Sequence, residues 1–293
     1  MKLKGKRILV TGHDGFIGSY LVPELEKNNE VLTLEREEGF IDVRDWRKLE
    51  SIGEVDVIYH LAAVTFVPYS FDHPRETYEV NVAGTINILE LARLRSVEKI
   101  VTMSSYVYGR PQYLPIDENH PLQPNNPYTH SKMVMEKLCQ GYSTDFGLEC
   151  VILRPFNIYG PGQGDNFLIP SIIKQLKQGK IELQDPEPRR DFIYVADVID
   201  ALLKAGSYSP ADKLDIFNVG YGESYSVSDI VDKIVELHGK EVDVSYTGDR
   251  RPNEVMDTVA DITHIQDKMD WKPLTSLNDG LSIILDQSFN IKV

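Results

Sequence analysis

The chain has no long apolar run and almost no cysteine. No apolar stretch approaches the roughly 20 residues that a membrane-spanning helix needs. The basic and then apolar start is soon interrupted by glycines and an aspartate, so it predicts a first strand and not a signal peptide. Cys139 and Cys150 form neither a metal-ligand spacing nor a disulfide framework. We therefore expect a cytoplasmic protein with no metal site and no membrane partner.

Positive charge is also scarce. The 31 Lys and Arg residues face 45 Asp and Glu residues, which gives a formal net charge of −14. This balance argues against a nucleic-acid partner or an anionic membrane surface. A small anionic ligand is still compatible with it, because a few placed arginines can dominate one site. The 293 residues, of which 42% are apolar, predict one large domain or two intimate domains.

What the chain does contain is a regular alternation of short β-branched runs and helical patterns. The spacing indicates βαβ units and an α/β fold with a parallel sheet. Central runs such as "DVIYHLAA" are apolar on both faces, as a sheet covered by helices requires. The expected strands are Arg7–Thr11, Glu30–Glu35, Val55–Leu61, Lys99–Ser104 and Glu149–Arg154, and the expected helices are Gly15–Lys27, Val80–Leu94 and Tyr128–Phe146.

Three glycines follow the first strand, in "LVTGHDGFIG". Gly12, Gly15 and Gly18 have the spacing GxxGxxG, which differs from the common GxGxxG. Such a turn lets the backbone approach a pyrophosphate at a helix N-terminus, although a tight packing turn would use the same residues. Glu35, near the end of the second strand, suits a ribose diol and favours NAD. Arg36 would instead favour a 2′-phosphate, so NADP is the alternative.

Further motifs follow in order along the chain. Tyr128 and Lys132, in "YTHSK", lie one helical turn apart, and "NVAGT" begins at Asn81. Together with the glycines, this ordered set resembles the extended short-chain dehydrogenase/reductase superfamily, and within it the NAD-dependent sugar epimerase/dehydratase family. The other motifs that carry the resemblance are "HLAA" at 60–63, "MSSYVYG" at 103–109, "RPFNIYGPG" at 154–162, "RRDFIYVADV" at 189–198 and "NVGYGESYSV" at 218–227.

The resemblance implies a Rossmann fold, which is a doubly wound parallel sheet, with a smaller, discontinuous α+β substrate domain. The alternation of strand and helix patterns is also interrupted after Pro155, where a Gly/Asn/Pro loop begins. We expect the dinucleotide-binding domain to comprise 1–156 with about 191–221 and 256–262. The nucleotide-sugar-binding domain would comprise about 157–190, 222–255 and 263–293.

The resemblance also implies a catalytic set of Ser104, Tyr128 and Lys132. Tyr128 would take the proton of a sugar hydroxyl while hydride leaves the same carbon. Tyrosine has a reference pKa near ~10, and a neighbouring ammonium such as Lys132 favours its phenolate. Lys132 would also hold the nicotinamide ribose. Ser104 would hydrogen-bond the reacting oxygen; Ser105 suits that task less well and is expected to touch the substrate.

The remaining contacts are expected on the same basis. Asp42 matches an acidic residue near the adenine, although it could equally belong to a helix start. His13, His60 and Asn81 are interpreted as structural. The expected cofactor-binding residues are Gly12, Gly15, Phe16, Ile17, Glu35, Asp42, Val43, Leu61, Ala62, Ala63, Tyr128, Lys132 and Pro155. The expected substrate-binding residues are Ser104, Ser105, Tyr128, Asn157, Arg190 and Arg251.

The resemblance also implies that two arginines of the second domain neutralise a nucleotide diphosphate, and a guanidinium matches phosphate geometry. The alternative for both Arg190 and Arg251 is a surface ion pair. Thr258 falls where relatives limit the size of the substituent at C2 of the sugar. Its modest size leaves N-acetyl sugars open.

These residues predict an NAD-dependent nucleotide-sugar 4-epimerase of the UDP-glucose/UDP-galactose type that acts through a transient 4-keto sugar in carbohydrate metabolism. Tyr106 stands two residues after Ser104, where the family's dehydratases and decarboxylases place an acid. A reductase, dehydratase or decarboxylase of the same family is the alternative, and a non-catalytic dinucleotide-binding regulator is the other class of protein considered. The resemblance also implies a homodimer, formed through the helix after Asn81 and the helix that carries Tyr128.

Overall fold

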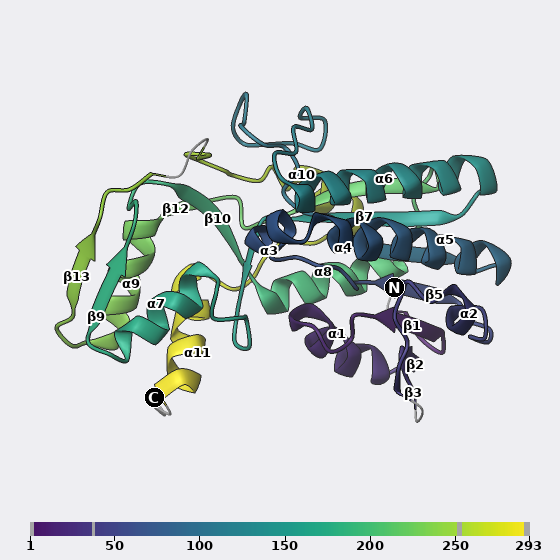
Figure 1. The fold of residues 1–293 in the computed structure, drawn as a ribbon, viewed down its shortest axis with the longest axis horizontal. Helices are drawn as coiled ribbons and strands as arrows, with labels where there is room; N and C mark the ends of the chain where they lie inside the picture. The colour runs from purple at the N-terminus through teal and green to yellow at the C-terminus, as the bar shows by residue number, and fades with distance from the viewer. Residues whose placement is uncertain (1–2, 37–38, 251–253, 290–293) are drawn as a thin grey trace.

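A six-stranded sheet forms the centre of the protein. The computed structural model describes residues 3–36, 39–250 and 254–289 (Figure 1). The strands pair in parallel in the order β11-β7-β6-β5-β1-β2. Strand order reverses at β1, where open α/β sheets bind their ligands. The strands are β1 (Arg7–Thr11), β2 (Glu30–Thr33), β5 (Val57–His60), β6 (Lys99–Met103), β7 (Glu149–Pro155) and β11 (Leu214–Val219).

Helices cover both faces of this sheet, as the apolar strands predicted (Figure 1). Along β1, Ile8 and Val10 belong to one apolar cluster and Leu9 belongs to the other. The period of two in a strand assigns neighbouring residues to opposite faces. The α/β Rossmann prediction is confirmed by this architecture. The covering helices are α1 (Phe16–Glu26) and α8 (Val195–Ser207) on one face, and α2 (Trp46–Leu49), α5 (Gly84–Leu94) and α6 (Pro127–Phe146) on the other.

A second group of elements lies beside the six-stranded sheet and its covering helices (Figure 1). This group contains two small sheets and three helices of the described residues. In one sheet, β10 pairs in parallel with β8 and antiparallel with β12. In the other, β13 pairs with β9. One apolar cluster continues from the large sheet into these helices, so the division into two domains stays a prediction. The elements are β8 (Asn157–Tyr159), α7 (Leu168–Leu176), β9 (Lys180–Leu183), β10 (Arg189–Tyr194), β12 (Ser224–Ser226), α9 (Val227–His238), β13 (Asp243–Tyr246) and α11 (Leu277–Phe289).

The helix expected over Val80–Leu94 is not continuous. A π-helical turn, η1 (Glu79–Ala83), precedes α5. Within it, the Asn81 side chain accepts a hydrogen bond from Val64 N at 2.7 Å and donates to Ser131 Oγ at 2.9 Å. These contacts join distant segments, so the periodicity of the sequence could not reveal them. The remaining elements are β3 (Glu35–Arg36), β4 (Gly39–Phe40), α3 (Val67–Asp72), α4 (Pro74–Tyr78) and α10 (Thr263–Met269).

Two further properties concern the described residues only. None of their helices is both long and apolar enough to cross a membrane. No group of three or more His, Cys, Asp or Glu side chains among them could hold a metal ion.

Candidate active site

The glycine turn between β1 and α1 forms a tightly packed cradle. Gly12 has φ +69°, and a Cβ there would lie 2.7 Å from the backbone nitrogen of Ala62. A Cβ on Gly18 would lie 2.1 Å from the carbonyl oxygen of Gly12. Gly15 is the N-cap of α1, and it supplies no side-chain cap; the first turn also contains no acidic residue. Close packing explains Gly12 and Gly18, while the N–H groups at the start of α1, with no side-chain cap, fit a pyrophosphate.

Other residues expected at the cofactor surround this cradle. Thr11 Oγ1 accepts hydrogen bonds from the backbone nitrogens of Leu61 and Ala62, at 3.2 and 3.1 Å. These bonds tie the carboxyl end of β1 to the segment after β5. Because all these strands are parallel, their carboxyl ends share one edge of the sheet. The expected residues at this edge are Phe16 and Ile17 at the start of α1, Leu61, Ala62 and Ala63 after β5, and Pro155 at the end of β7.

The expected adenine side is only partly described. The backbone of Glu35 lies in β3, while the side chains of Glu35 and Arg36 lie outside the described part of the chain. Asp42 is engaged by Arg44, whose Nε and Nη2 donate to it at 2.9 and 2.6 Å, and this pairing lowers the pKa of Asp42. Val43 is buried against α5, where a Cβ on Gly84 would lie 2.6 Å from Val43 Cγ2.

His60 is held neutral in a chain of buried hydrogen bonds. Thr11 Oγ1 already accepts two N–H groups, so its hydroxyl donates to His60 Nδ1 at 2.8 Å. His60 Nε2 lies 3.0 Å from Thr85 Oγ1, which itself donates to the carbonyl of Asn81. Burial, aided by the charge of Lys132, lowers the pKa of His60 to about 3. The residue thus links strand ends and helix α5, which agrees with a structural role.

Local sequence determines where helix α6, which carries Tyr128 and Lys132, begins. Asn126 and Thr129 form a capping box, with Thr129 N donating to Asn126 Oδ1 at 2.9 Å and Pro127 in the first turn. Tyr128 therefore lies in the first turn of α6. Lys132 follows one turn later, and its Nζ donates to the carbonyl oxygen of Met103 at 2.8 Å. This bond fixes Lys132, and with it this part of α6, to the end of β6.

Burial shifts the pKa of both members of the pair toward their neutral forms. It raises the pKa of Tyr128, although a hydrogen bond with Ser105 opposes this shift. It lowers the pKa of Lys132 to about 8, while Cys139 and Glu136 act in the opposite direction. Tyr128 of the free protein is therefore protonated near neutral pH. A further positive charge beside it would favour the phenolate.

A pocket of about 210 Å³ lies next to Tyr128. Arg190 is the only formally charged side chain among the described residues that line it. Residues near the six-stranded sheet and residues of the second group of elements both line the pocket. It therefore brings together residues that are distant in sequence. Five of its lining residues are Ser105, Tyr128, Asn157, Arg190 and Thr258.

The two serines after β6 have different surroundings. Ser105 lines the pocket and hydrogen-bonds Tyr128. Ser104 is 3% exposed, and its Oγ is buried without a hydrogen-bond partner. The Oγ1 of Thr258 is likewise buried and unpartnered. These two hydroxyls retain hydrogen-bonding capacity at the site.

Tyr106 fills the position two residues after Ser104. Its hydroxyl donates to the carbonyl oxygen of Gly109 at 2.6 Å, and its ring lies against Phe156 at a centroid distance of 5.4 Å. Burial raises the pKa of Tyr106 far above its usual value. The side chain is therefore a neutral part of the wall and a poor proton shuttle.

The substrate-side residues are held by contacts that the sequence did not reveal. Asn157 Nδ2 donates to the carbonyl oxygen of Asp191 at 3.2 Å. Asp191 is fully buried, and its carboxylate accepts from three backbone nitrogens, those of Tyr221, Gly222 and Ala260. Arg190 is paired with Glu254. Arg251, the other expected arginine, lies outside the described residues.

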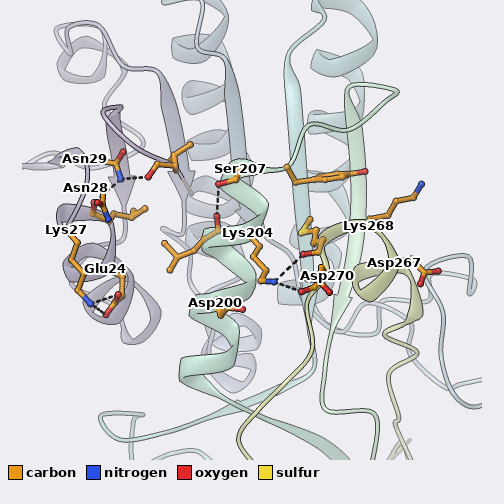
Figure 2. A pocket seen from close by; sticks show the side chains of 15 residues that line it. Glu24, Lys27, Asn28, Asn29, Asp200, Lys204, Ser207, Asp267, Lys268 and Asp270 are labelled. Atoms are coloured by element: carbon orange, nitrogen blue, oxygen red, sulfur yellow. Dashed lines mark hydrogen bonds and ion pairs between the residues drawn. The ribbon is translucent and has the colours of Figure 1, made fainter. Parts of the chain in front are cut away.

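A larger hollow, of about 810 Å³, lies elsewhere, between α1, α8 and α10 (Figure 2). Figure 2 shows Lys204 directed at the backbone of Asp270, where it donates a hydrogen bond. Lys27 is paired with Glu24 on the same wall. None of the residues expected to be catalytic or to bind ligand lines this hollow. We therefore place the candidate active site in the smaller pocket.

Comparison with known proteins identifies the family. Residues 8–220 match the model of the NAD dependent epimerase/dehydratase family. The chain belongs to this family. It is 38% identical to a Methanocaldococcus jannaschii protein named "Putative UDP-glucose 4-epimerase", over 95% of this chain and 97% of that protein. It is 30% identical to the GDP-6-deoxy-D-mannose reductase of Pseudomonas aeruginosa, over 96% of both chains.

A solved structure agrees with this membership. UDP-glucose 4-epimerase from Thermotoga maritima, determined with UDP-glucose, superposes with a TM-score of 0.89 at 26% identity, covering 97% of this chain and 98% of that one. The predicted family, the enzyme class and the nicotinamide dinucleotide cofactor are confirmed by these comparisons. The roles of individual site residues stay predictions.

Proposed function

We propose that the chain is an NAD-dependent nucleotide-sugar 4-epimerase of the UDP-glucose/UDP-galactose type. One observation carries the proposal: Tyr128 begins α6 at a pocket whose described lining has a single charged side chain, Arg190, and the pocket shares the ligand-binding edge of the sheet with the glycine cradle. The names of relatives such as the M. jannaschii protein support the same activity.

The residues suit proton movement at C4 of the sugar. When bound, NAD would accept hydride from C4 and return it to the other face of the 4-keto sugar. Tyr128 takes the C4 hydroxyl proton and later gives it back. Lys132 favours the phenolate by its charge, and we assign to it the nicotinamide ribose. Ser104 offers an unpartnered hydroxyl to the reacting oxygen, and Ser105 orients Tyr128.

Tyr106 stands where the family's dehydratases and decarboxylases have an acid, and this favours epimerisation over loss of water or carbon dioxide. The hydroxyl of Tyr106 is already committed to Gly109, and its raised pKa keeps it neutral. Dehydration needs a proton shuttle at the carbon next to C4. A phenol in this environment cannot supply one near neutral pH.

We place the nucleotide diphosphate beside Asn157 and Arg190, with Arg251 as a further contact. Arg190 and Asn157 line the pocket, and a guanidinium binds phosphate oxygens in matched geometry. Thr258 lines the same pocket and has a buried, unpartnered hydroxyl. Its small side chain leaves room for an N-acetyl group at C2.

A keto-sugar reductase is the second candidate. The identity with the P. aeruginosa reductase favours it, and a reductase would use the same Tyr128 and Lys132. Arg36, next to Glu35, would suit the 2′-phosphate of NADPH. The cofactor therefore separates the two activities: an epimerase retains and regenerates NAD, whereas a reductase consumes NADPH.

We also propose a cytoplasmic homodimer. Helices α5 and α6 contact each other and leave large apolar side chains exposed, including Ile86, Leu94 and Phe146, which are 39, 46 and 56% exposed. Pairing of these helices across a two-fold axis would cover such side chains. Light scattering at micromolar concentration is expected to give twice the chain mass, and a monomer would refute the pairing.

The proposed function is tested by the cofactor that the purified protein carries. Mass spectrometry after denaturation is expected to detect NAD and not NADP. The same preparation, without added cofactor, is expected to interconvert C4 epimers of a UDP-sugar. Bound NADPH, with turnover only while NADPH is consumed, would instead establish the reductase.

A further inference from the structure

The Arg190 guanidinium already has hydrogen-bond and ion-pair partners in the free protein. Its Nη2 donates to the carboxylate of Glu254, and its Nη1 donates to the carbonyl oxygens of Val255 and Arg189, at 2.6 and 2.8 Å. The Arg190 and Glu254 side chains are only 23 and 14% exposed. Solvent therefore screens their attraction less than that of a surface pair. An anionic ligand that enters the pocket meets a cation that already holds a carboxylate.

The fold keeps Glu254 within reach of Arg190. The backbone nitrogen of Arg189 donates to the carbonyl oxygen of Met256 at 2.8 Å, and Ala260 N donates to Asp191 Oδ2 at 3.1 Å. These two bonds hold the segment from Met256 to Ala260 alongside β10. Glu254 lies two residues before Met256, so the same segment that carries Thr258 brings its carboxylate to Arg190, behind the pocket lining.

We propose that Glu254 is an internal counter-ion that competes with the substrate diphosphate for Arg190 and so sets the affinity and charge selectivity of the pocket. This inference rests on the proposed function, which supplies the diphosphate. Binding requires Arg190 to exchange a carboxylate for phosphate oxygens, and any carboxylate left nearby repels the ligand. A diphosphate compensates for this exchange better than a ligand with one negative charge.

The test compares Glu254→Gln with wild type by calorimetry, using UDP and inorganic pyrophosphate as probes. The variant is expected to bind both probes about tenfold more tightly, as for a lost competing charge contact. Glu236→Gln removes the same charge from an exposed position of α9 and is expected to match wild type. The free Glu254→Gln protein should melt at or below the wild-type temperature, because Arg190 loses its partner.

Two further variants keep the test decisive. Glu254→Asp retains the charge and is expected to stay close to wild type. In an Arg190→Gln background, Glu254→Gln is expected to change UDP affinity less than twofold, since the competed cation is gone. Equal or weaker binding of both probes by Glu254→Gln would overturn the inference. If wild type does not bind UDP, yet Glu254→Gln binds pyrophosphate more tightly than wild type does, the proposed substrate fails and the counter-ion stands.

Discussion

Glu136 and Arg154 form a two-pronged ion pair inside the protein, with Arg154 Nε and Nη2 donating to the two carboxylate oxygens at 2.9 and 2.7 Å. Both side chains are 4% exposed. Glu136 lies one helical turn beyond Lys132 on α6, while Arg154 belongs to β7 and also donates to the hydroxyl of Tyr108. The pair thus anchors α6, which carries Tyr128 and Lys132, to the sheet.

Glu136→Gln is expected to lower the free energy of unfolding by about 3–5 kcal/mol, because it leaves the Arg154 charge buried without its partner. Urea unfolding followed by circular dichroism measures the change. The matched control is Glu24→Gln, since Glu24 pairs with Lys27 on the exposed side of α1 and should cost at most about 1 kcal/mol. Equal losses in the two variants would contradict the anchoring role.

Tyr128→Phe is expected to abolish turnover while cofactor binding and folding stay close to wild type. The substitution removes the proton acceptor and little else, because Tyr128 lies in the first turn of a capped helix. Steady-state kinetics and a cofactor titration separate these effects. Most of the activity surviving in the purified variant would remove Tyr128 from the mechanism.

Lys132→Met is expected to lose activity yet gain stability at neutral pH. Burial lowers the pKa of Lys132 from 10.5 to about 8, a shift equivalent to about 3 kcal/mol, partly offset by the lost bond to Met103. The folded pKa lies below the unfolded one, so wild type is disfavoured below pH 8 and recovers as pH rises toward 10.5. Unfolding at pH 7 and pH 10 should therefore show a shrinking difference, and a constant difference would contradict the assignment.

The two serines give a matched pair of alanine variants. Ser104→Ala is expected to lower kcat about 100-fold with little change in stability, because it removes a hydrogen bond made only to the reacting oxygen. Ser105→Ala removes the bond that lowers the pKa of Tyr128, so the acidic limb of the kcat/KM profile should move to higher pH. If Ser105→Ala lowers kcat strongly and Ser104→Ala leaves kcat near the wild-type value, the catalytic hydroxyl is that of Ser105.

Much of the fold could be predicted because its signals are local. Both ends of α6 carry capping signals in the sequence. Asn126 and Pro127 stand at its start, and Gly147, with φ +71°, stands at its end. The strands at the centre of the sheet were recognisable as β-branched runs that are apolar on both faces. Glycine spacing after β1 likewise predicted a tight turn, in which a Cβ on Gly12 or Gly18 would collide with neighbouring backbone.

What could not be predicted depends on contacts between distant segments. In the π-turn around Asn81, the Asn81 side chain bridges Val64 and Ser131, which are distant in sequence. Glu254 meets Arg190 only because its segment runs along β10. The sequence also ranked Ser104 above Ser105, while their different exposure to the pocket became visible only in the structure.

The central claim is tested most directly with UDP-glucose carrying deuterium at C4. The enzyme is incubated with it without added NADH or NADPH, and the products are followed by NMR and mass spectrometry. The account predicts UDP-galactose of unchanged mass with deuterium still at C4, because the hydride that leaves C4 is the one that returns. Loss of the label to solvent, a product lighter by water or carbon dioxide, or turnover only with stoichiometric NADPH would contradict it.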